Sequence, residues 1–365
     1  MQQKPQIIAF YLPQFHPIPE NDEWWGKGFT EWTSVGNAKP LFKGHYQPKV
    51  PADLGYYDLR LPIVREQQAQ MAKDAGIDGF CYWHYWFGNG KQLMADIIDD
   101  VLASETPDFP FCLGWANHSW YAKNWNSNDT KGKDRLLIEQ TYPGKEDIRM
   151  HYNYVRNFFK DPRYIKIDNK PFFMVFNAKD TPAGFIESWN QWAKEDGFDG
   201  VYFAGNIPNS SLVKEFVGKG FNAVIIERLK NIIAKRKEKK LSFVWNKIKA
   251  HLFAIPDCKY NYNEVIDIIV DPNSDINEHV IPSIIPNFDH SPRSGRYGLI
   301  LHGSTPELFS KMCTKVFNLI DKKQNKIVLL RSWNEWGEGN YMEPDLRYKN
   351  QYLVALKKAL EKYGK

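Results

Sequence analysis

The sequence is poor in cysteine and has no long hydrophobic run, and both absences limit what the protein can be. Its four cysteines (Cys81, Cys112, Cys258 and Cys313) are scattered over 365 residues without a CxxC pair. We therefore expect buried thiols of a cytoplasmic protein rather than a disulfide scaffold. No apolar run approaches the roughly 18–20 residues that a transmembrane helix needs. The N-terminus leads directly into a strand-like run, so we see no secretory signal pattern.

A strong charge imbalance is also missing. The chain has 48 basic and 43 acidic residues, and a net charge of +5 is too small to indicate a nucleic-acid partner. Aromatic residues, in contrast, are abundant at 15%, with 13 Trp and 19 Tyr. A hydrophobic core alone rarely needs so many Trp and Tyr side chains, so some of these rings are expected at a binding surface.

Short β-branched and aromatic runs alternate with helical patterns along nearly the whole chain. We predict strands at Ile7–Leu12, Ile77–Trp83, Phe111–Ala116, Phe172–Phe176, Gly200–Ala204, Phe221–Ile226, His279–Ile285 and Ile327–Trp333. The predicted helices are Leu61–Ala75, Gln92–Ser104, Ile148–Phe159, Phe185–Glu195, Pro306–Leu319 and Tyr352–Tyr363. This alternation favours an α/β fold, a (β/α)₈ TIM barrel, with a doubly wound sheet as the alternative. No Gly-rich phosphate turn follows the first strand, which counts against the alternative.

Three long segments depart from a minimal barrel. Pro13–Leu59 and His118–Tyr142 follow predicted strands, so they are expected at the C-terminal face, where barrel enzymes build their active sites. The third is a basic helical insertion at about 229–277. We see no linker or internal repeat, and we predict that residues 1–365 form a single catalytic domain.

The insertion begins with a basic run and continues with an amphipathic stripe. The run is Lys230, Lys235, Arg236, Lys237, Lys239 and Lys240, and the stripe is Leu241, Val244, Trp245, Ile248 and Leu252. A solvated surface helix is the simplest interpretation. Peripheral contact of Lys230–Lys240 with an anionic membrane surface or glycan is the alternative, which would place a cytoplasmic protein at the inner face of the membrane.

The densest group of chemically useful residues follows the last predicted strand. Glu335 and Glu338 are three residues apart across a Gly-containing turn, so both side chains can face one site. Cleavage of a glycosidic bond requires two carboxyl groups beside the sugar, one of them protonated. We therefore predict Glu335 and Glu338 as the catalytic residues, converging un-neutralised on one ring-lined hollow that is open to solvent. The alternative is that they cap the final helix or pair with Arg331.

Mixed aromatic and polar runs end the other predicted strands as well. Aromatic rings bind the C–H faces of sugars, while amide and imidazole groups bind hydroxyls. The predicted substrate-binding residues are Tyr11, Gln14, His16, Trp32, Trp83, His84, Tyr85, Trp115, Asn117, Trp120, Trp333, Asn334 and Trp336.

Other chemistries find little support in the sequence. His16, His84 and His118 could converge on a metal ion, but there is no HExxH motif and no short paired His/Cys spacing. There is also no GxSxG elbow and no GxxxxGK[ST] loop. We therefore expect neither a metal ion nor another cofactor.

Several of these stretches together resemble a known family. They are Ile8–His16, Gly28–Trp32, His45–Pro48 with Leu54–Asp58, Trp115–Asn117, and Trp333–Gly339 with Glu343-Pro344. They resemble the WbsX-like family, a bacterial group found with polysaccharide and lipopolysaccharide O-antigen biosynthesis. That group is related to the endo-α-mannosidases of glycoside hydrolase family 99. The resemblance runs from about Ile7 to the C-terminal helix.

The resemblance implies a (β/α)₈ barrel and a catalytic pair in the Asn-Glu-Trp-x-Glu run. Glu335 would assist the substrate's own 2-hydroxyl, and Glu338 would be the general acid/base. The 2-hydroxyl would attack C1 to give a 1,2-anhydro sugar, which water then opens with retention. Gly337 stands where family 99 often has His, a difference that concerns substrate contacts more than the acid pair.

Three hypotheses about function follow. The first is a retaining endo-glycosidase or transglycosylase that acts on a bacterial surface polysaccharide. The second is a glycosyltransferase of O-antigen biosynthesis, although the sequence has no convincing Asp-x-Asp element for a nucleotide sugar. The third is a glycan-binding barrel without catalysis. All three predict an oligo- or polysaccharide partner and no nucleic acid.

Overall fold

Eight parallel strands of the described chain form a barrel. The computed structural model describes residues 4–122, 135–238, 256 and 258–363. The strands, in the order of their pairing, are β10 (Ala223–Ile226), β9 (Tyr202–Ile207), β8 (Lys170–Val175), β4 (Phe111–Trp115), β2 (Gly79–Trp86), β1 (Gln6–Tyr11), β15 (Ile327–Leu330) and β12 (Ser283–Ile284). A parallel bridge between Val224 and Val280 joins the two ends. The predicted (β/α)₈ barrel is confirmed.

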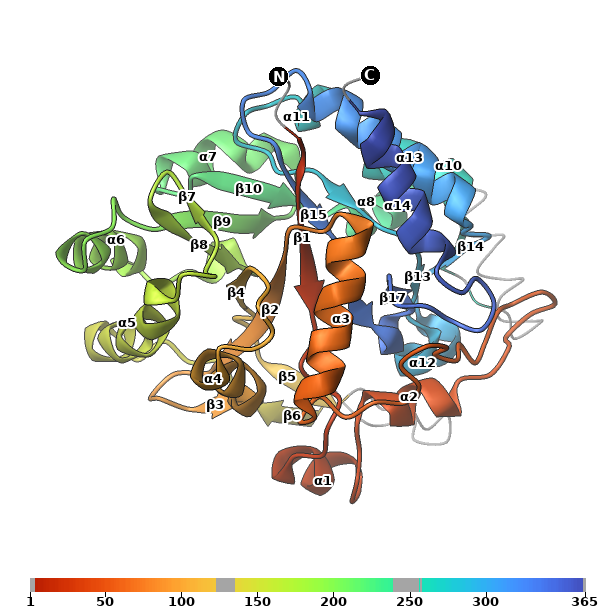
Figure 1. The fold of residues 1–365 in the computed structure, drawn as a ribbon, viewed down its shortest axis with the longest axis horizontal. Coiled ribbons are helices and arrows are strands. Elements are labelled where there is room, and N and C mark those ends of the chain that lie inside the picture. The colour runs from red at the N-terminus through yellow and green to blue at the C-terminus, as the bar shows by residue number, and fades with distance from the viewer. Residues whose placement is uncertain (1–3, 123–134, 239–255, 257, 364–365) are drawn as a thin grey trace.

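Helices cover the outside of the barrel (Figure 1). They are α3 (Pro62–Ala75), α4 (Ala95–Ser104), α5 (Lys145–Lys160), α6 (Phe185–Glu195), α7 (Val213–Gly218), α8 (Arg228–Glu238), α10 (Tyr262–Ile269), α11 (Pro272–Asp275), α13 (Pro306–Ile320) and α14 (Gln351–Lys362). Since these helices enclose the sheet, its strands are buried on both faces. All eight residues of β2 are buried, for example.

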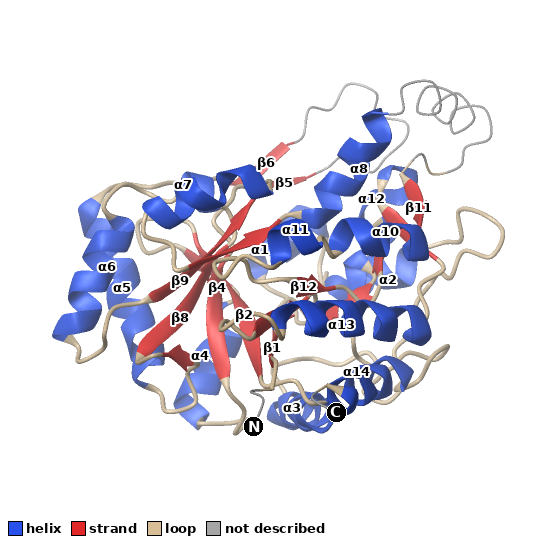
Figure 2. Ribbon diagram, turned by 90° about the horizontal axis from the view of Figure 1, so that it is seen from above, coloured by secondary structure: helices blue, strands red, loops and turns tan. Residues whose placement is uncertain are grey.

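Shorter elements decorate the loops. They are α1 (Pro19–Trp25), α2 (Glu31–Asn37), β3 (Gln92–Leu93), β5 (Trp120–Ala122), β6 (Arg135–Ile138), β7 (Lys166–Ile167), β11 (Lys259–Asn261), β13 (Phe288–Asp289), α12 (Ser291–Ser294), β14 (Ile300–His302), β16 (Asn334–Glu335), the 3₁₀ turn η4 (Trp336–Glu338) and β17 (Asn340–Tyr341). The other 3₁₀ turns are η1 (Ala178–Asp180), η2 (Ser210–Leu212) and η3 (Gly295–Tyr297). The start of β1 and the end of α14 lie at one end of the barrel, and β5 and β6 lie at the opposite end (Figures 1 and 2).

Two predicted elements differ from the structure for local reasons. The helix predicted at Gln92–Ser104 begins at Ala95, because Gln92 and Leu93 pair with the end of β2 as a short antiparallel strand. The strand predicted at His279–Ile285 is reduced to Ser283–Ile284, and its first part contributes only the closing bridge to Val224.

The described part of the basic insertion contains α8, β11, α10 and α11. Lys239, Lys240 and the predicted stripe from Leu241 to Leu252 lie outside the described residues. No helix in the described ranges is long and apolar enough to cross a membrane. Contact of the basic run with a membrane or glycan stays a prediction, as does the single-domain organisation of residues 1–365.

Candidate active site

Glu335 and Glu338 lie on a short hairpin that follows β15. Glu335 ends β16, which pairs antiparallel with β17, and Glu338 ends η4. The Glu335 side chain is half-buried, and that of Glu338 is 22% exposed. Because β15 is a barrel strand, both carboxyl groups belong to the C-terminal face of the barrel.

Trp83, near the end of β2, holds the carboxyl group of Glu335. Its indole Nε1–H donates a hydrogen bond to Glu335 Oε1 at 2.8 Å. The indole is itself fixed by stacking on Phe10, with ring centroids 4.7 Å apart. Trp83 is 8% exposed, so it orients Glu335 more than it offers a free ring face.

Glu338 is ion-paired, which the sequence analysis does not predict. Arg293, in α12, donates from Nη1 to Glu338 Oε1 at 2.8 Å, and His290 Nε2 lies 3.7 Å from the same oxygen. The expectation that both acids are un-neutralised is therefore wrong for Glu338. Arg331, the partner that the sequence suggests as an alternative, instead donates to Glu227 at 3.4 and 3.5 Å.

The two glutamates have pKa values that shift in opposite directions. Burial, and then the nearby Glu338 carboxylate, raise the pKa of Glu335 well above its ordinary value. Burial acts the same way on Glu338, but Arg293 and then His290 outweigh it and lower the pKa of Glu338. Two carboxyl groups whose environments separate their pKa values can divide the work of acid and base.

Glu31 supports this arrangement from α2, and the sequence analysis names it only within a motif. Its carboxylate accepts from Arg293 Nη2 at 2.8 and 3.0 Å and from the Gly337 backbone N–H at 2.7 Å. Glu31, Arg293, His290 and Glu227 lie in short or irregular segments. No periodic pattern in the sequence singles out such residues.

Trp333 and Trp336 do not offer the open ring faces that the sequence analysis expects. Both are fully buried. Trp336 stacks on Tyr341 with centroids 3.8 Å apart and donates from Nε1 to Glu343. Glu343 also accepts from Tyr57 and Gln68, and burial raises its pKa to about 7 despite these bonds. These contacts hold the hairpin in place.

Two predicted sugar-binding amides connect backbone segments instead. Asn334 is fully buried and bonds both backbone groups of Leu12, accepting at 2.7 Å and donating at 3.0 Å. Asn117 is also fully buried and bonds both backbone groups of Asn177, at 2.7 and 2.9 Å. Both amide groups therefore hydrogen-bond backbone groups near strand ends.

Further predicted contact residues also belong to the core. Tyr11 donates to Gln68, and Trp115 donates to the Trp86 carbonyl. His84 lies 2.9 Å from His151 between their Nε2 atoms. All of these side chains are buried, and their partners lie on the outer helices α3 and α5 or on β2.

His16 is buried too, and its Nε2 lies 2.9 Å from Asp96 Oδ2. His118 is exposed and packs on Phe176. In the described ranges, no group of three or more His, Cys, Asp or Glu side chains could hold a metal ion.

Four predicted residues stay near the acid pair or partly exposed. Tyr85 is buried beside Glu335, and after burial the Glu335 charge is the main cause of its raised pKa. Trp120 is half-buried and meets Tyr85 edge-on, with centroids 5.1 Å apart. Trp32 and Gln14 are half-buried, and the Trp32 indole donates to the Tyr57 carbonyl.

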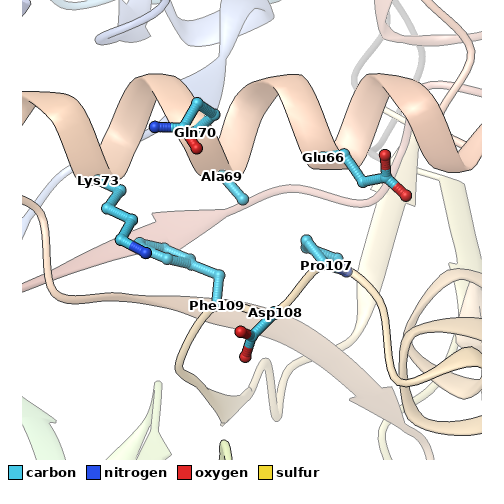
Figure 3. Close-up of a pocket in the computed structure, with 7 residues that line it drawn as sticks. All are labelled: Glu66, Ala69, Gln70, Lys73, Pro107, Asp108 and Phe109. Carbon is cyan, nitrogen blue, oxygen red and sulfur yellow. The ribbon is translucent and has the colours of Figure 1, made fainter.

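A shallow hollow of about 280 Å³ lies elsewhere, between α3 and the segment before β4 (Figure 3). It is lined by Glu66, Ala69, Gln70, Lys73, Pro107, Asp108 and Phe109. Since it precedes β4, it belongs to the N-terminal side of the barrel, and it contains none of the predicted site residues.

The comparisons with known proteins place the chain in a family. The sequence model described as glycosyltransferase WbsX matches residues 7–356, so the chain belongs to this family. The WxcX proteins of two strains of Xanthomonas campestris pv. campestris (B100 and ATCC 33913) are each 32% identical over 374 residues. The match covers 97% of this chain and 49% of theirs, so the chain spans about half the length of these relatives.

Solved structures share the fold. A glycoside hydrolase-like protein superposes with a TM-score of 0.59 and 18% identity, covering 98% of this chain and 94% of that one. A family 99 endo-α-mannosidase from Bacteroides thetaiotaomicron superposes with a TM-score of 0.58 and 15% identity, covering 98% and 97% of the two chains.

Proposed function

We propose that this member of the WbsX glycosyltransferase family is a carbohydrate-active enzyme that cleaves or transfers glycosidic bonds of a bacterial surface polysaccharide. One domain, residues 1–365, carries the activity, and Glu335 and Glu338 are its catalytic residues. The observation that carries the proposal is the pair itself. Two carboxyl groups with opposite pKa shifts lie three residues apart at the C-terminal face of a barrel.

The reaction that suits this pair proceeds with retention of configuration. The substrate's 2-hydroxyl attacks C1, the bond from C1 to the leaving oxygen breaks, and a 1,2-anhydro sugar forms. One glutamate takes the 2-hydroxyl proton, while the other gives a proton to the leaving oxygen. Water, or an acceptor sugar, then opens the ring at C1, and the two protons return by the reverse routes. The enzyme needs no nucleophile of its own in this scheme.

The resemblance to family 99 supports the scheme and adds a division of labour. By this resemblance, Glu335 takes the proton of the 2-hydroxyl, and Glu338 gives a proton to the leaving oxygen. Tyr85, beside Glu335, contacts Trp120, and Trp120 contacts Trp24. The half-buried rings of Trp120 and Trp24 support a carbohydrate substrate, because such rings pack on sugar C–H faces.

The experiment is a screen of lipopolysaccharide and mannan fragments with the wild-type protein, Glu335→Gln and Glu338→Gln. Each substitution is expected to lower the rate by about 100-fold or more, because a proton carrier is lost. Glu66→Gln, an exposed glutamate on α3, is the matched control and should leave the rate within about threefold. If Glu338→Gln cleaves as fast as this control, the assignment is wrong. Glycan binding without turnover in the wild type would favour the non-catalytic barrel.

A second candidate is a glycosyltransferase that uses a nucleotide sugar, which the name of the family favours. A thermal-shift panel of nucleotide sugars tests it. Stabilisation by one donor by several degrees supports transfer from an activated sugar, since a ligand that binds the folded state raises its melting temperature. If no nucleotide sugar changes the melting temperature and a glycan is cleaved, the result favours the first candidate, an enzyme that acts on glycosidic bonds.

A further inference from the structure

Four polar side chains line one part of the barrel interior next to the acid pair. They are Asn206 of β9, Glu227 directly after β10, Ser283 of β12 and Arg331 directly after β15. β9 pairs with β10, β12 pairs with β15, and the bridge between Val224 and Val280 joins the two pairs. These four residues, the polar quadrant, therefore come from neighbouring strands at the C-terminal face of the barrel.

The direction of Asn206 and Glu227 follows from the alternation of side chains along a strand. Phe203 of β9 packs on Trp189 of the outer helix α6, so it points outward. Asn206 lies three positions further on and therefore points into the barrel. Ile225 of β10 is its register partner, and Glu227 lies two positions beyond Ile225. Both polar side chains thus share the inner face.

Arg331 and Ser283 point inward for the same reason. Arg331 Nη1 lies 3.4 and 3.5 Å from the two carboxylate oxygens of Glu227, although β10 and β15 do not pair with each other. The two side chains therefore meet inside the barrel. Leu329, two positions before Arg331, shares its face and is the register partner of Ser283. The Ser283 hydroxyl therefore faces the interior as well.

The ion pair between Glu227 and Arg331 is loose. Its distances of 3.4 and 3.5 Å exceed the about 2.7–2.9 Å that is typical of a hydrogen bond between charged groups. Within the described ranges, the Arg331 side chain makes no other hydrogen bond. The Arg331 and Glu227 side chains are 16% and 8% exposed. Guanidinium donors and carboxylate lone pairs are therefore left over for a ligand in the barrel mouth.

Two oxygens of the polar quadrant have no hydrogen-bond partner in the part of the chain that the structure describes. They are Oδ1 of the half-buried Asn206 and the hydroxyl oxygen of Ser283, a residue that is 7% exposed. At other strand ends, the buried amides of Asn117 and Asn334 bond two backbone groups each. A buried polar group without a partner costs stability, so the fold alone does not explain the polar quadrant. Its unused donors and acceptors point to a ligand with hydroxyl groups.

Arg331 connects the polar quadrant to the acid pair. Its positive charge acts on Glu335 and Glu338 as well as on Glu227. Three carboxyl groups around one guanidinium leave no surplus of positive charge for a ligand carboxylate or phosphate. A sugar hydroxyl carries no charge and can both donate and accept a hydrogen bond. The charges around Arg331 therefore favour a neutral sugar over an acidic one.

We propose that the polar quadrant binds the hydroxyl groups of a neutral sugar unit, the unit whose glycosidic bond meets the acid pair. Arg331 donates to a sugar oxygen, and Glu227 and Asn206 accept from sugar hydroxyls. The loose contact between Glu227 and Arg331 gives way to the sugar, which then also reaches the hydroxyl of Ser283. The inference rests on the proposed function and adds to it the class of sugar and the residues that select it.

The test is an NMR titration of the protein with methyl α-mannoside, methyl α-glucoside and methyl α-galactoside. Each neutral glycoside is compared with its uronate, which has a carboxylate at C6 and is otherwise the same. We expect the wild type to bind at least one neutral glycoside. It should bind the matching uronate more weakly by about tenfold or more, because the carboxylates of the site repel it.

Variants of the polar quadrant should weaken the binding of the neutral glycoside. Glu227→Gln/Arg331→Gln removes both charges together, so neither is left unpaired, and should lower the affinity by about tenfold or more. Asn206→Ala should lower it by about three- to tenfold. Asn157→Ala removes an exposed asparagine of the outer helix α5 and is the matched control, which should bind like the wild type.

Ser283→Ala and deoxy glycosides separate contact with the ligand from a structural role. The hydroxyl of Ser283 has no partner, so its removal should leave the melting temperature equal to or above that of the wild type, while the affinity for the glycoside falls. A deoxy glycoside that lacks the hydroxyl bound by Asn206 should bind the wild type more weakly than the parent glycoside does. Asn206→Ala should bind the two equally, which a structural effect of the substitution would not produce.

The inference is overturned if no neutral glycoside binds, if the uronate binds as tightly as its neutral partner, or if the variants of the polar quadrant bind as tightly as Asn157→Ala. Glycan cleavage without any dependence on the polar quadrant would retain the proposed function and refute this inference. Binding that depends on the polar quadrant, without cleavage of any glycan, would retain the sugar site and refute the catalytic role of the acid pair.

Discussion

Trp83 and Glu335 are 252 positions apart in the chain, yet the indole N–H of Trp83 lies 2.8 Å from the Glu335 carboxyl group. The contact joins the second barrel strand to the hairpin that follows the last one. It explains why a buried tryptophan stands at the end of β2. Its ring packs on Phe10, and its single polar atom is used for the candidate acid.

Trp83→Phe should keep the stacking on Phe10 and remove the hydrogen bond. The bond from Trp83 lowers the pKa of Glu335, so without it the pKa should rise further and the limb of the pH–rate profile that Glu335 sets should move to higher pH. We expect about a tenfold loss of rate, as for a misoriented proton carrier, and a loss of about 1–2 kcal/mol in the free energy of unfolding. Trp115→Phe removes another buried indole donor, one that bonds a backbone carbonyl. It should cost similar stability without moving the Glu335 titration, and an equal shift in both variants would contradict the role of Trp83.

Gly337→Ala should disrupt the bridge from Arg293 to Glu31. The added methyl group would overlap the Glu31 carboxylate, so we expect a loss of about 1–3 kcal/mol in unfolding free energy, measured by chemical denaturation. The enzymatic activity of Gly337→Ala should fall together with its unfolding free energy. Gly36→Ala is the control, because that glycine lies in α2 with open space around it and should be neutral or slightly stabilising.

The double variant Glu31→Ala/Gly337→Ala distinguishes overlap from a general intolerance of alanine. Removing the Glu31 carboxylate makes room for the methyl group, so the two losses of stability should be less than additive. Fully additive losses would show that Gly337 is needed for another reason.

The barrel could be predicted because its signals are periodic and local. β2 is a run of buried, mostly aromatic residues, and α3 begins at a proline and ends at Gly76, whose φ of 87° suits the left-handed position that closes a helix. The proximity of Glu335 and Glu338 could be predicted because the two glutamates follow one strand end at close spacing; their catalytic role stays a prediction. Such features depend only on neighbouring residues.

The surroundings of the pair could not be predicted in the same way. Arg293 lies in a four-residue helix and Glu31 at the start of another, and their meeting with Glu338 depends on the path of long loops. The sequence predicts Trp336 at a binding surface, but the composition of a turn does not determine which way its rings point. The structure buries this ring against Tyr341 and uses its N–H for Glu343.

Asn334→Ala should destabilise the protein by about 2–4 kcal/mol. The Asn334 amide bonds both the N–H and the C=O of Leu12, and its loss leaves two buried backbone groups without partners. Asn209→Ala is the control, since Asn209 is exposed and bonds only the neighbouring Ser211; it should cost less than about 1 kcal/mol. Denaturant unfolding measures both, and similar values would show that Asn334 does not hold β1 to the hairpin.

The buried pair His84 and His151 should make the protein less stable as the pH falls. Burial lowers the pKa of His84 to about 3, and it lowers that of His151 as well, so both imidazoles stay neutral in the folded state. In the unfolded chain they titrate at about 6.5. Between these values the unfolded state binds more protons, so their contribution to stability is present above about pH 6.5 and is lost on going down toward pH 3. Two such groups give a slope of up to about 2.7 kcal/mol per pH unit.

Other groups also titrate in this range, so the informative quantity is a difference between variants. Glu343, whose pKa is raised, changes stability in the opposite direction, because folding favours its protonated form. His84→Gln stays neutral at every pH and should flatten the decline in unfolding free energy between pH 6.5 and 5 by about 1.4 kcal/mol per unit. His279→Gln replaces an exposed histidine and should leave the slope as it is. If the unfolding free energy of His84→Gln falls with pH as steeply as that of the wild type, the His84 imidazole is protonated inside the fold and the prediction is wrong. A buried charge there would need a counter-charge, which the aromatic rings around His151 do not supply.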